Sequence, residues 1–277
     1  MFQTLAGRHI LITGAGTGIG RGLALDFADR GAKVALHYAH SADGAESAAA
    51  TIRAAGGTAA VLKADLGEVS QARQLPERAA EALGDLDGVI NNSGITMNRP
   101  LLKTTPEQYD TLFNVNVRGM FFVSQGAAEI MIPRQGGTLV NISSVHAYGA
   151  MTEHSVYAAT KAAIVGLTRT MSLELIQQGV RVNCIASGWV LVENQRKVLE
   201  LDETFDEQAA AQVLPSGFIG QGSDIGALAA FLSSPESRYI IGQTINCDGG
   251  QTTIMPAVPF FRDPVTVQYG QGYVPGL

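Results

Sequence analysis

The sequence predicts a single α/β domain with a doubly wound, seven-stranded parallel sheet and helices on both faces. Two observations predict it. Short apolar runs alternate with longer, helix-like stretches, with one such unit about every 25 to 30 residues. Glycine is abundant, with 32 residues in 277, and it falls between these runs, where turns and helix ends are expected. Such alternation needs right-handed crossovers, which place successive strands parallel in one sheet.

Each strand is predicted from a short run of apolar, often β-branched residues. The seven runs are residues 9–13, 33–38, 58–64, 88–90, 137–142, 180–185 and 239–247. Between them, helical periodicity and end signals predict helices at residues 21–30, 42–55, 69–83, 106–131, 153–178 and 223–232. The helix at 106–131 has the clearest start, because Thr105 can cap it and Pro106 suits its first turn.

Two segments depart from this rhythm. Residues 189–222 contain no further strand-like run, and 193–212 has a charged, helical pattern. A long insertion at this place is commonly a lid, so we predict a lid at 189–222, with a surface helical hairpin as the alternative. Residues 253–277 have no period but carry prolines and aromatic side chains, which predicts an extended tail that packs on the domain or on a neighbouring subunit. The predicted domain therefore comprises residues 1–252.

Composition argues against several classes of function. A net charge of −6 and a pI near 5.4 argue against nucleic acid as a partner. No Cys and His residues have metal-ligand spacing, so no metal is expected, and Cys184 and Cys247 are predicted to be buried free thiols. The first residues lack a signal-peptide core, and no apolar run reaches about 18 residues, so we expect no membrane span and a cytoplasmic location.

A glycine-rich turn after the first strand predicts nucleotide binding. Its pattern is Gly14-x-x-x-Gly18-x-Gly20, and a helix follows it. Phosphate groups can approach a backbone without side chains, and a helix N-terminus offers free N–H groups and a partial positive charge. The contacts expected here come from Gly14, Thr17, Gly18, Ile19 and Gly20. A purely structural turn is the alternative.

The end of the second strand predicts which nucleotide is bound. Sites that prefer NAD usually place a carboxylate here, to bind the ribose hydroxyls. The sequence instead reads Tyr38-Ala39-His40-Ser41, with no acid before Asp43. An acid would repel a 2′-phosphate, whereas His40 and Ser41 can donate hydrogen bonds to one. We therefore expect NADP(H) to be favoured over NAD(H); a solvated loop without cofactor contact is the alternative.

Tyr157 and Lys161, four residues apart, are the candidate chemical groups. On a helix they lie on one face, one turn apart. A nearby positive charge favours the phenolate and lowers the pKa of tyrosine from its usual value of about 10. Such a pair can exchange protons near neutral pH. The same spacing is common for a half-exposed tyrosine beside a solvated lysine, so its meaning depends on the other motifs.

With these motifs in place, the chain resembles the short-chain dehydrogenase/reductase family from about residue 7 to residue 250. The motifs occur in the family's order: the glycine turn, Asp65, the run Asn91-Asn92-Ser93-Gly94, Asn116, Ser144 thirteen residues before Tyr157, and Lys161. The resemblance implies a Rossmann-type domain and a catalytic tetrad of Asn116, Ser144, Tyr157 and Lys161.

The resemblance also implies what these residues do. Tyr157 is the expected general acid and base, Lys161 holds the nicotinamide ribose, and Ser144 bonds the substrate oxygen. Asn116 is expected to bind a water that links Lys161 to solvent, or to kink its helix. Further cofactor contacts are expected from Asp65, Leu66, Asn92, Ser93, Gly94, Tyr157, Lys161, Gly188 and Val190. The candidate substrate contacts are Ser144, His146, His154 and Trp189.

Two positions depart from the family pattern. Ser187 replaces the usual proline before Gly188, and Val192 replaces a threonine that typically bonds the nicotinamide carboxamide. We therefore expect one cofactor contact to be lost and the loop to be less rigid, although the backbone of Val190 can still serve.

The sequence thus predicts an NAD(P)(H)-dependent oxidoreductase that interconverts a secondary alcohol and a ketone. The predicted substrate is a small polar molecule of the sugar, sugar acid or polyol type, because polar residues surround the expected pocket: Ser93, Asn98, His146, Glu193 and Asn194. An alternative is reduction of 3-oxoacyl thioesters in fatty-acid synthesis, and a weaker one is an NADP(H)-binding regulator without turnover. By resemblance, a homotetramer is expected, with no nucleic-acid or membrane partner.

Overall fold

A parallel sheet lies at the centre of the structure, a computed structural model that describes residues 5–193, 196, 200–202, 204–254 and 261–262. Its strand order is β3-β2-β1-β4-β5-β6-β7, and all neighbouring strands are parallel. The strands are β1 (His9–Ile12), β2 (Lys33–Tyr38), β3 (Ala59–Lys63), β4 (Gly88–Asn91), β5 (Gly137–Ser144), β6 (Val180–Ser187) and β7 (Thr244–Cys247). The predicted fold class is confirmed.

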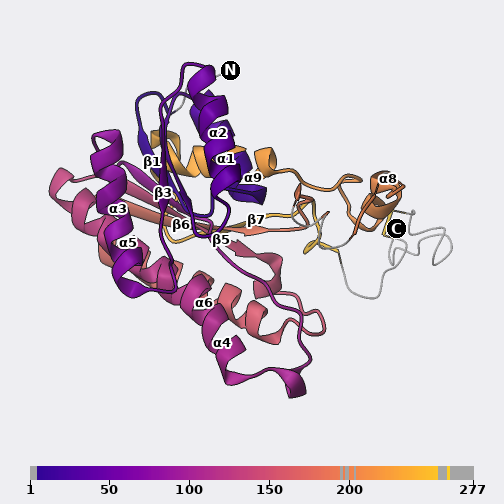
Figure 1. The fold of residues 1–277 in the computed structure, drawn as a ribbon. Coiled ribbons are helices and arrows are strands. Elements are labelled where there is room, and N and C mark those ends of the chain that lie inside the picture. The colour runs from indigo at the N-terminus through magenta and orange to yellow at the C-terminus, as the bar shows by residue number, and fades with distance from the viewer. Residues whose placement is uncertain (1–4, 194–195, 197–199, 203, 255–260, 263–277) are drawn as a thin grey trace, which may run out of the picture.

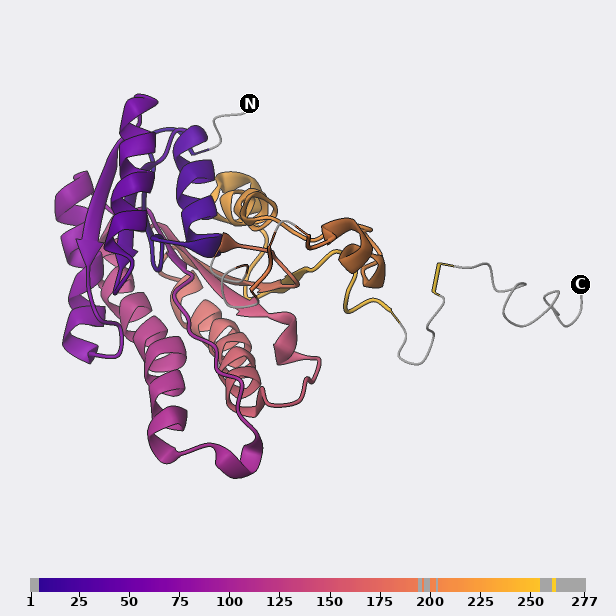
Figure 2. The ribbon, with the colours of Figure 1, turned by 45° about the vertical axis from the view of Figure 1, so that its right-hand side comes forward.

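Helices cover both faces of the sheet, as Figures 1 and 2 show from two sides. On one face, α1 (Gly18–Asp29), α2 (Ala42–Ala54) and α9 (Gly222–Ser233) form a single apolar core with the strands. On the other, α3 (Val69–Leu83), α5 (Met120–Met131) and α6 (Ser155–Ile176) form a second core. A further helix, α4 (Pro106–Phe113), packs against α6.

The sequence pattern explains these two layers. Ile10, Leu11 and Ile12 of β1 are all buried, because helices cover the strand on both faces; such a strand is apolar throughout rather than alternating. In α1, Leu23 and Phe27 are buried one turn apart and face the sheet. Apolar runs and helical periodicity are therefore sufficient to specify the layers.

The sheet reverses its strand order at β1, which has β2 on one side and β4 on the other. At such a switch point a crevice opens outside the carboxyl ends of the strands, and ligands commonly bind there. The glycine turn follows β1, the segment 91–94 begins at the end of β4, and Ser144 ends β5. All three predicted motifs therefore lie at one edge of the sheet.

Several predicted boundaries are wrong. The predicted helix at 106–131 is divided by a π-helix, η2 (Asn114–Gly119), between α4 and α5. The predicted strand at 239–247 is only β7, and Tyr239 is 95% exposed. Helix α1 starts three residues earlier than predicted, inside the glycine turn, because glycines hide a helix start from propensity. Cys184 is buried as predicted, but Cys247 is only partly buried.

Short helices complete the part of the chain that the structure describes. They are η1 (Leu101–Lys103), η3 (Ile132–Arg134), η4 (Val145–Ala147), α8 (Glu207–Ala210), η5 (Ala211–Val213) and η6 (Pro235–Ser237). Of the predicted helix at 193–212, only α8 and η5 are fully described. In these regions no helix is long and apolar enough to cross a membrane.

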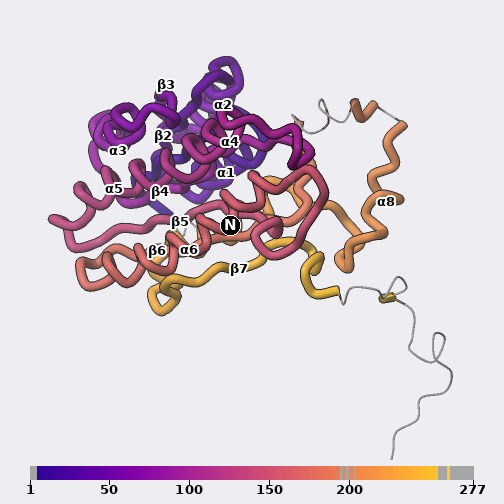
Figure 3. Tube along the Cα trace, turned by 90° about the horizontal axis from the view of Figure 1, so that it is seen from below, coloured from indigo at the N-terminus to yellow at the C-terminus, as the bar shows by residue number. Residues whose placement is uncertain are grey.

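The segment 189–222 leaves the sheet after β6, and its α8 stands apart from the main body in Figures 1 and 3. An isolated bridge between Val190 and Gly220 closes its base. There the Gly220 N–H donates to the Trp189 carbonyl at 3.1 Å, and the Leu191 N–H donates to the Gly220 carbonyl at 3.1 Å. We call residues 189–222 the lid segment; its residues 194–195, 197–199 and 203 lie outside the described chain.

Most of the predicted tail also lies outside the described residues. One of its described members, Arg262, donates hydrogen bonds to the Leu214 carbonyl and, at 3.3 Å, to Gln212 Oε1. This part of the tail is therefore in contact with the lid segment of its own chain.

Candidate active site

The glycine turn is built from positions that tolerate no side chain. Gly14 has φ +67° and Gly18 has φ +59°, in the left-handed region that favours glycine. A Cβ atom on Gly20 would lie 2.1 Å from the Gly14 carbonyl oxygen. A Cβ atom on Gly16 would lie 2.2 Å from Ser41 Oγ. The backbone is therefore folded tightly here, with Thr17 preceding α1 and Ile19 packed against the core.

The segment after β4 bonds the turn from one side. The hydroxyl of Thr13 accepts the backbone N–H groups of Asn92 and Ser93, each at 2.9 Å. The side-chain amide of Asn92 donates to the carbonyl of Thr13 at 2.9 Å and to that of Gly14 at 3.3 Å. Asn92, predicted as a cofactor contact, thus uses its amide to hold the turn.

The second strand bonds the turn from the other side. The Gly14 N–H donates to Nδ1 of His37 at 3.1 Å, and the Ala15 N–H donates to the His37 carbonyl at 2.8 Å. Sequence reasoning missed His37, although a histidine inside an apolar strand was a visible signal. A polar side chain buried among apolar ones must find partners.

A carboxylate already lies at the N-terminus of α1. The Gly18 N–H donates to Oε2 of Glu193 at 3.4 Å, and Oε1 of Glu193 lies 4.0 Å from the Arg21 guanidinium. The Glu193 carboxylate therefore lies where the helix dipole and the backbone N–H of Gly18 favour a phosphate group. This contact supports the fit between the turn and a dinucleotide.

The predicted ribose contacts gather beside the turn. Ser41 immediately precedes α2, lies against Gly16, and makes no side-chain capping bond, so its hydroxyl can serve a ligand. His40 is exposed and Tyr38 ends β2. Asp43 is in the first turn of α2 and adds a negative charge nearby. Two donors and one acid therefore lie together at the place predicted for the ribose.

The predicted contacts after β3 and β4 reach the same edge. Asp65 is exposed, and its Oδ1 accepts the Gly67 N–H at 2.8 Å. Leu66 is buried, and its carbonyl lies 2.5 Å from a Cβ built on Gly119. A Cβ on Gly94 would lie 3.5 Å from Lys161 Nζ. Gly94 therefore borders the lysine that is expected to hold the nicotinamide ribose.

The structure brings Ser144, Tyr157 and Lys161 together between β5 and α6. The Lys161 ammonium lies 5.6 Å from the centre of the Tyr157 ring, over its face. It is buried and donates to the Ile142 carbonyl at 3.0 Å, which leaves two N–H groups for a ligand. The Ser144 hydroxyl donates to the Ser187 carbonyl at 3.3 Å and contacts Tyr157.

Burial changes the titration of this pair. It lowers the pKa of Lys161 to about 8, since burial penalises the charged ammonium. For Tyr157, burial raises the pKa above its usual value, and the hydrogen bond with Ser144 opposes this only in part. The predicted lowering of the Tyr157 pKa is therefore wrong for this structure, because burial penalises the charged phenolate more than the Ser144 hydrogen bond stabilises it. The tyrosine is held protonated, as a general acid must be.

The Asn116 side chain is fully engaged within the protein. Its Oδ1 accepts the Ile95 N–H at 2.8 Å, and its Nδ2 donates to the Ile95 carbonyl at 2.9 Å and to Thr160 Oγ1 at 3.1 Å. The side chain therefore fixes the loop after β4 to the tyrosine helix. Asn116 also lies in the π-helix η2, which agrees with the expected kink.

Two histidines stack beside Tyr157. The rings of His146 and His154 are 5.0 Å apart and nearly parallel, at 7°. Both meet the Tyr157 ring edge-on, at 5.6 and 6.0 Å. His146 Nδ1 is buried and has no hydrogen-bond partner among the described residues. Burial and the neighbouring His154 lower the pKa of His146, so its ring is neutral at pH 7.

The loop after β6 is held despite the change from the family pattern. The Ser187 hydroxyl donates to the Ser143 carbonyl at 3.3 Å, and the Gly188 N–H donates to the Cys247 carbonyl at 3.0 Å. A Cβ on Gly188 would lie 2.5 Å from Asp248 Cα. These bonds tie the start of the loop to β5 and β7, and the expected lower rigidity stays a prediction. Val192 packs against the apolar core, so it offers no polar contact.

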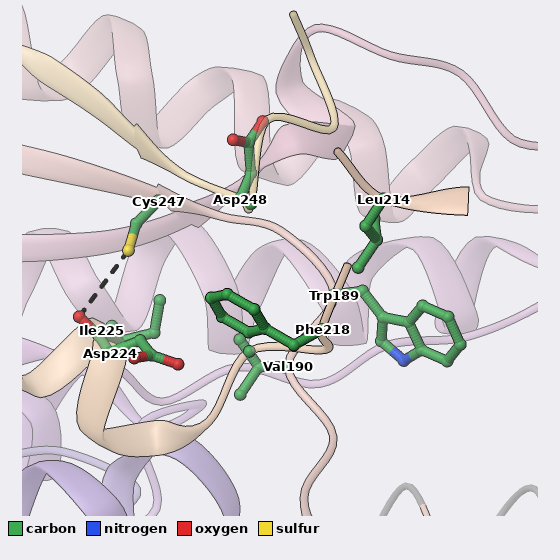
Figure 4. Close-up of a pocket in the computed structure, with 10 residues that line it drawn as sticks. Trp189, Val190, Leu214, Phe218, Asp224, Ile225, Cys247 and Asp248 are labelled. Carbon is green, nitrogen blue, oxygen red and sulfur yellow. Dashed lines mark hydrogen bonds between the residues drawn. The ribbon is translucent and has the colours of Figure 1, made fainter. Parts of the chain in front are cut away.

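An apolar pocket of about 180 Å³ lies between the lid segment and the end of β7. Figure 4 shows Phe218 above Val190, with Trp189 at the right of the view. Its lining consists of Trp189, Val190, Leu214, Phe218, Gly220, Asp224, Ile225, Cys247, Asp248 and Gly249. Trp189 thus contributes to an apolar pocket, and no tetrad residue lines it. Among the described residues, no group of acids, histidines and cysteines could hold a metal ion.

Comparisons with known proteins agree with this geometry. A family model described as enoyl-(acyl carrier protein) reductase matches residues 14–252. A hydroxynaphthalene reductase-like protein, Arp2 from Metarhizium anisopliae, is 35% identical over 91% of this chain and 97% of its own.

Two solved structures are similar in fold. One is a putative short-chain alcohol dehydrogenase from Sinorhizobium meliloti 1021, with a TM-score of 0.85, 33% identity, and coverage of 92% of this chain and 100% of the other. The second is a gluconate 5-dehydrogenase from Burkholderia cenocepacia J2315 in complex with NADP and tartrate, with a TM-score of 0.82, 33% identity, and coverage of 91% and 97%. Together with the motif order and the sheet, these matches show that the chain belongs to the short-chain dehydrogenase/reductase family of oxidoreductases.

Proposed function

We propose that this protein interconverts a secondary alcohol and a ketone on a small polar substrate, with NADP(H) as cofactor and Tyr157 as general acid and base. The observation that carries the proposal is the meeting of Ser144, Tyr157 and Lys161 at the switch-point edge of the sheet. A regulator without turnover needs only the glycine turn, so this meeting favours an enzyme.

The proton chemistry follows from the surroundings of Tyr157. A bound nicotinamide supplies hydride transfer to or from the substrate carbon. As a carbonyl oxygen gains charge, Tyr157 donates its proton, and in the opposite direction it takes the proton back. Ser144, whose hydroxyl donates to the Ser187 carbonyl in the structure, rotates that hydroxyl toward the same substrate oxygen and fixes its position. Lys161, with two N–H groups left over, holds a ribose hydroxyl and stabilises the phenolate that remains.

The cofactor preference is proposed from the end of β2. Ser41 and His40 are donors beside the turn, and the first carboxylate, Asp43, lies one helical position after Ala42. The gluconate 5-dehydrogenase of similar fold carries NADP, which supports the proposal. Asp65, Ser93, Gly94, Gly188 and Val190 lie along the sheet edge where the rest of a dinucleotide would extend.

The substrate class is proposed from the stacked histidines. Two imidazoles lie at the edge of Tyr157, and the Nδ1 of His146 has no hydrogen-bond partner among the described residues; such rings suit hydroxyl groups of a sugar or polyol. A sugar acid can also bind, but its carboxylate needs a protonated imidazole. Burial and the neighbouring His154 lower the pKa of His146 and so oppose its protonation. The affinity for a sugar acid should therefore fall as the pH rises through the region of the His146 pKa.

An acyl thioester is the second candidate substrate. The apolar pocket beside the lid segment suits an acyl chain, and the matching family model is described for an acyl-carrier-protein reductase. The two candidate substrates differ in chemistry. The histidines favour a substrate with hydroxyl groups, whereas the pocket favours a substrate with a long apolar chain.

A substrate panel with both cofactors tests the proposal. Polyols, sugars, sugar acids and 3-oxoacyl thioesters are offered with NADP(H) and NAD(H), and absorbance of the reduced cofactor is followed. We expect the highest kcat/KM with a polyhydroxy substrate and NADP(H), and a fall of at least tenfold for that substrate alone in His146→Phe. Preference for a long-chain thioester, with no effect of His146→Phe, would replace the first candidate with the second.

We further propose a cytoplasmic homotetramer. Large apolar side chains of α4, α5 and α6, namely Tyr109, Phe121 and Leu173, are exposed in the single chain and suit a subunit interface. The Arg262 contact supports a tail that packs on its own domain. Mass measurement in solution, with and without a truncation after Thr252, tests both statements.

A further inference from the structure

His37 is a buried histidine that the catalytic chemistry does not use. It lies in β2 with 1% of its surface exposed, next to apolar neighbours in the strand. Both ring nitrogens have partners: Nδ1 lies 3.1 Å from the Gly14 nitrogen, and Nε2 lies 3.1 Å from the Ala64 carbonyl oxygen. Because the backbone N–H can only donate, Nδ1 must accept, and Nε2 must then donate its hydrogen to Ala64. The geometry thus fixes one neutral tautomer.

The His37 ring binds a part of the glycine turn that neighbouring side chains also enclose. A Cβ on Gly14 would lie 3.0 Å from Ser93 Oγ and 3.2 Å from Asn92 Nδ2, so the Gly14 peptide is enclosed from the β4 side. The Gly14 N–H points to the β2 side, toward His37. His37 also accepts the next N–H, that of Ala15, on its own carbonyl. One residue therefore fixes two successive peptides of the turn, while the Gly18 N–H further on receives the carboxylate of Glu193.

The ring also ties three strands together at this edge. Its side chain links the turn after β1 to Ala64, which follows β3, across β2 itself. Without the acceptor, the partly buried Gly14 N–H would be left without a partner, and an unsatisfied donor that is shielded from water is costly. The turn would then move to find another acceptor and lose the backbone shape that receives phosphate.

We propose that His37 is a positioning residue for the cofactor, whose ring fixes the glycine turn in the shape that binds the dinucleotide phosphates. The proposal rests on the proposed cofactor but not on any substrate. It requires a neutral ring, and burial supplies this by lowering the pKa of His37 to about 4. The charged groups that face the ring act in opposite directions, since Arg78 lowers this pKa and Asp65 raises it.

Two substitutions separate the two ring contacts. In His37→Asn, the amide oxygen stands close to the place of Nδ1 and can accept the Gly14 N–H. In His37→Gln, the longer amide reaches toward Ala64 and leaves Gly14 without its acceptor. Val34→Ala, in the same strand but away from the turn, is the matched control for loss of stability alone.

Fluorescence titration with NADPH and with NADH gives the first readout. The wild type establishes which nucleotide binds, and so tests the cofactor assignment separately. For that nucleotide, we expect His37→Gln to raise Kd about tenfold, and His37→Asn to stay within about threefold of the wild type. Val34→Ala should leave Kd unchanged. At saturating cofactor, kcat should change little in any variant, because His37 touches neither substrate nor proton.

Hydrogen exchange of the protein without nucleotide gives a second readout that needs no binding. In His37→Gln, the peptide containing Gly14 and Ala15 should exchange faster than in His37→Asn, when compared at equal global stability. The proposal is overturned if the Gln and Asn variants bind and exchange alike, or if Val34→Ala weakens binding as much as His37→Gln. It is also overturned if the Kd of the wild type does not rise as the pH falls through about 4, where the ring becomes protonated.

Discussion

Among the described residues, one hydrogen bond joins the glycine turn to the lid segment, but the two regions are held in opposite ways. The turn is bonded by Thr13, His37 and Asn92, with most distances between 2.8 and 3.1 Å, and its peptides are enclosed. The lid segment is joined to the sheet at its base through the Val190–Gly220 bridge, and side chains such as Val213 and Phe218 are 64% and 60% exposed. Local stability follows the density of such buried contacts.

The difference separates two tasks within one site. The residues of the glycine turn and of the predicted tetrad are held tightly in one arrangement. A cofactor and a proton donor need such an arrangement to be positioned for reaction. The lid segment carries Trp189 and Phe218 at the apolar pocket and Glu193 at the Gly18 N–H. We propose that the less constrained region contributes to substrate choice, and that the more constrained one determines the reaction type. Four predictions test this division, in order of decreasing effect.

Removal of the proton donor should have the largest effect. Tyr157→Phe should lower kcat at least about a hundredfold, because acid–base catalysis contributes at this scale. Binding of NADPH, followed by fluorescence, should remain normal because the turn is untouched. Near-normal turnover in this variant would show that the tetrad does not carry the reaction.

Acid should weaken the turn through His37. Its folded pKa of about 4 is below the unfolded value of 6.5, so the unfolded chain binds the proton more readily. Stability is full above pH 6.5 and falls as the pH drops toward 4, by about 3 kcal/mol at most. Urea unfolding at pH 7 and pH 4.5 should show a smaller loss for His37→Asn than for the wild type. An equal loss in both would mean that other groups account for the acid sensitivity.

A single methyl group in the turn should be costly. Gly20→Ala places a Cβ 2.1 Å from the Gly14 oxygen, and the resulting strain should cost about 1–3 kcal/mol in unfolding free energy and weaken NADPH binding. Gly136→Ala is the control, since a Cβ there meets no atom within 4 Å. Equal stability of the two variants would show that the turn can relax.

Removing the contact between the glycine turn and the lid segment should have the smallest effect. Glu193→Gln removes the charge that lies on the Gly18 N–H, so a phosphate should meet less competition there. We expect Kd for NADPH to fall about two- to threefold at low salt, and the gain to shrink at about 1 M salt. Weaker binding in this variant would assign Glu193 a helping role instead.

The fold could be predicted well because its signals are local. Apolar runs such as 137–142 and 180–185 became the buried strands β5 and β6, and the order of motifs placed Ser144 and Tyr157 at one edge. Predictions were wrong where tertiary contacts override propensity. The π-helix at Asn114–Gly119 interrupts a continuous helical pattern, and Asn116 there bonds a loop distant in sequence.

The sequence alone determined the sheet, the glycine turn and the family, and it predicted the tetrad, because each depends on residue types at fixed spacing. Only the tertiary structure decided how these groups are tuned. Burial raises the pKa of Tyr157 and lowers that of Lys161, and it makes His37 a neutral acceptor for Gly14. The tertiary structure also stacks the ring of His146 on that of His154. Desolvation and long-range hydrogen bonds depend on which segments pack together, and no local pattern specifies that packing.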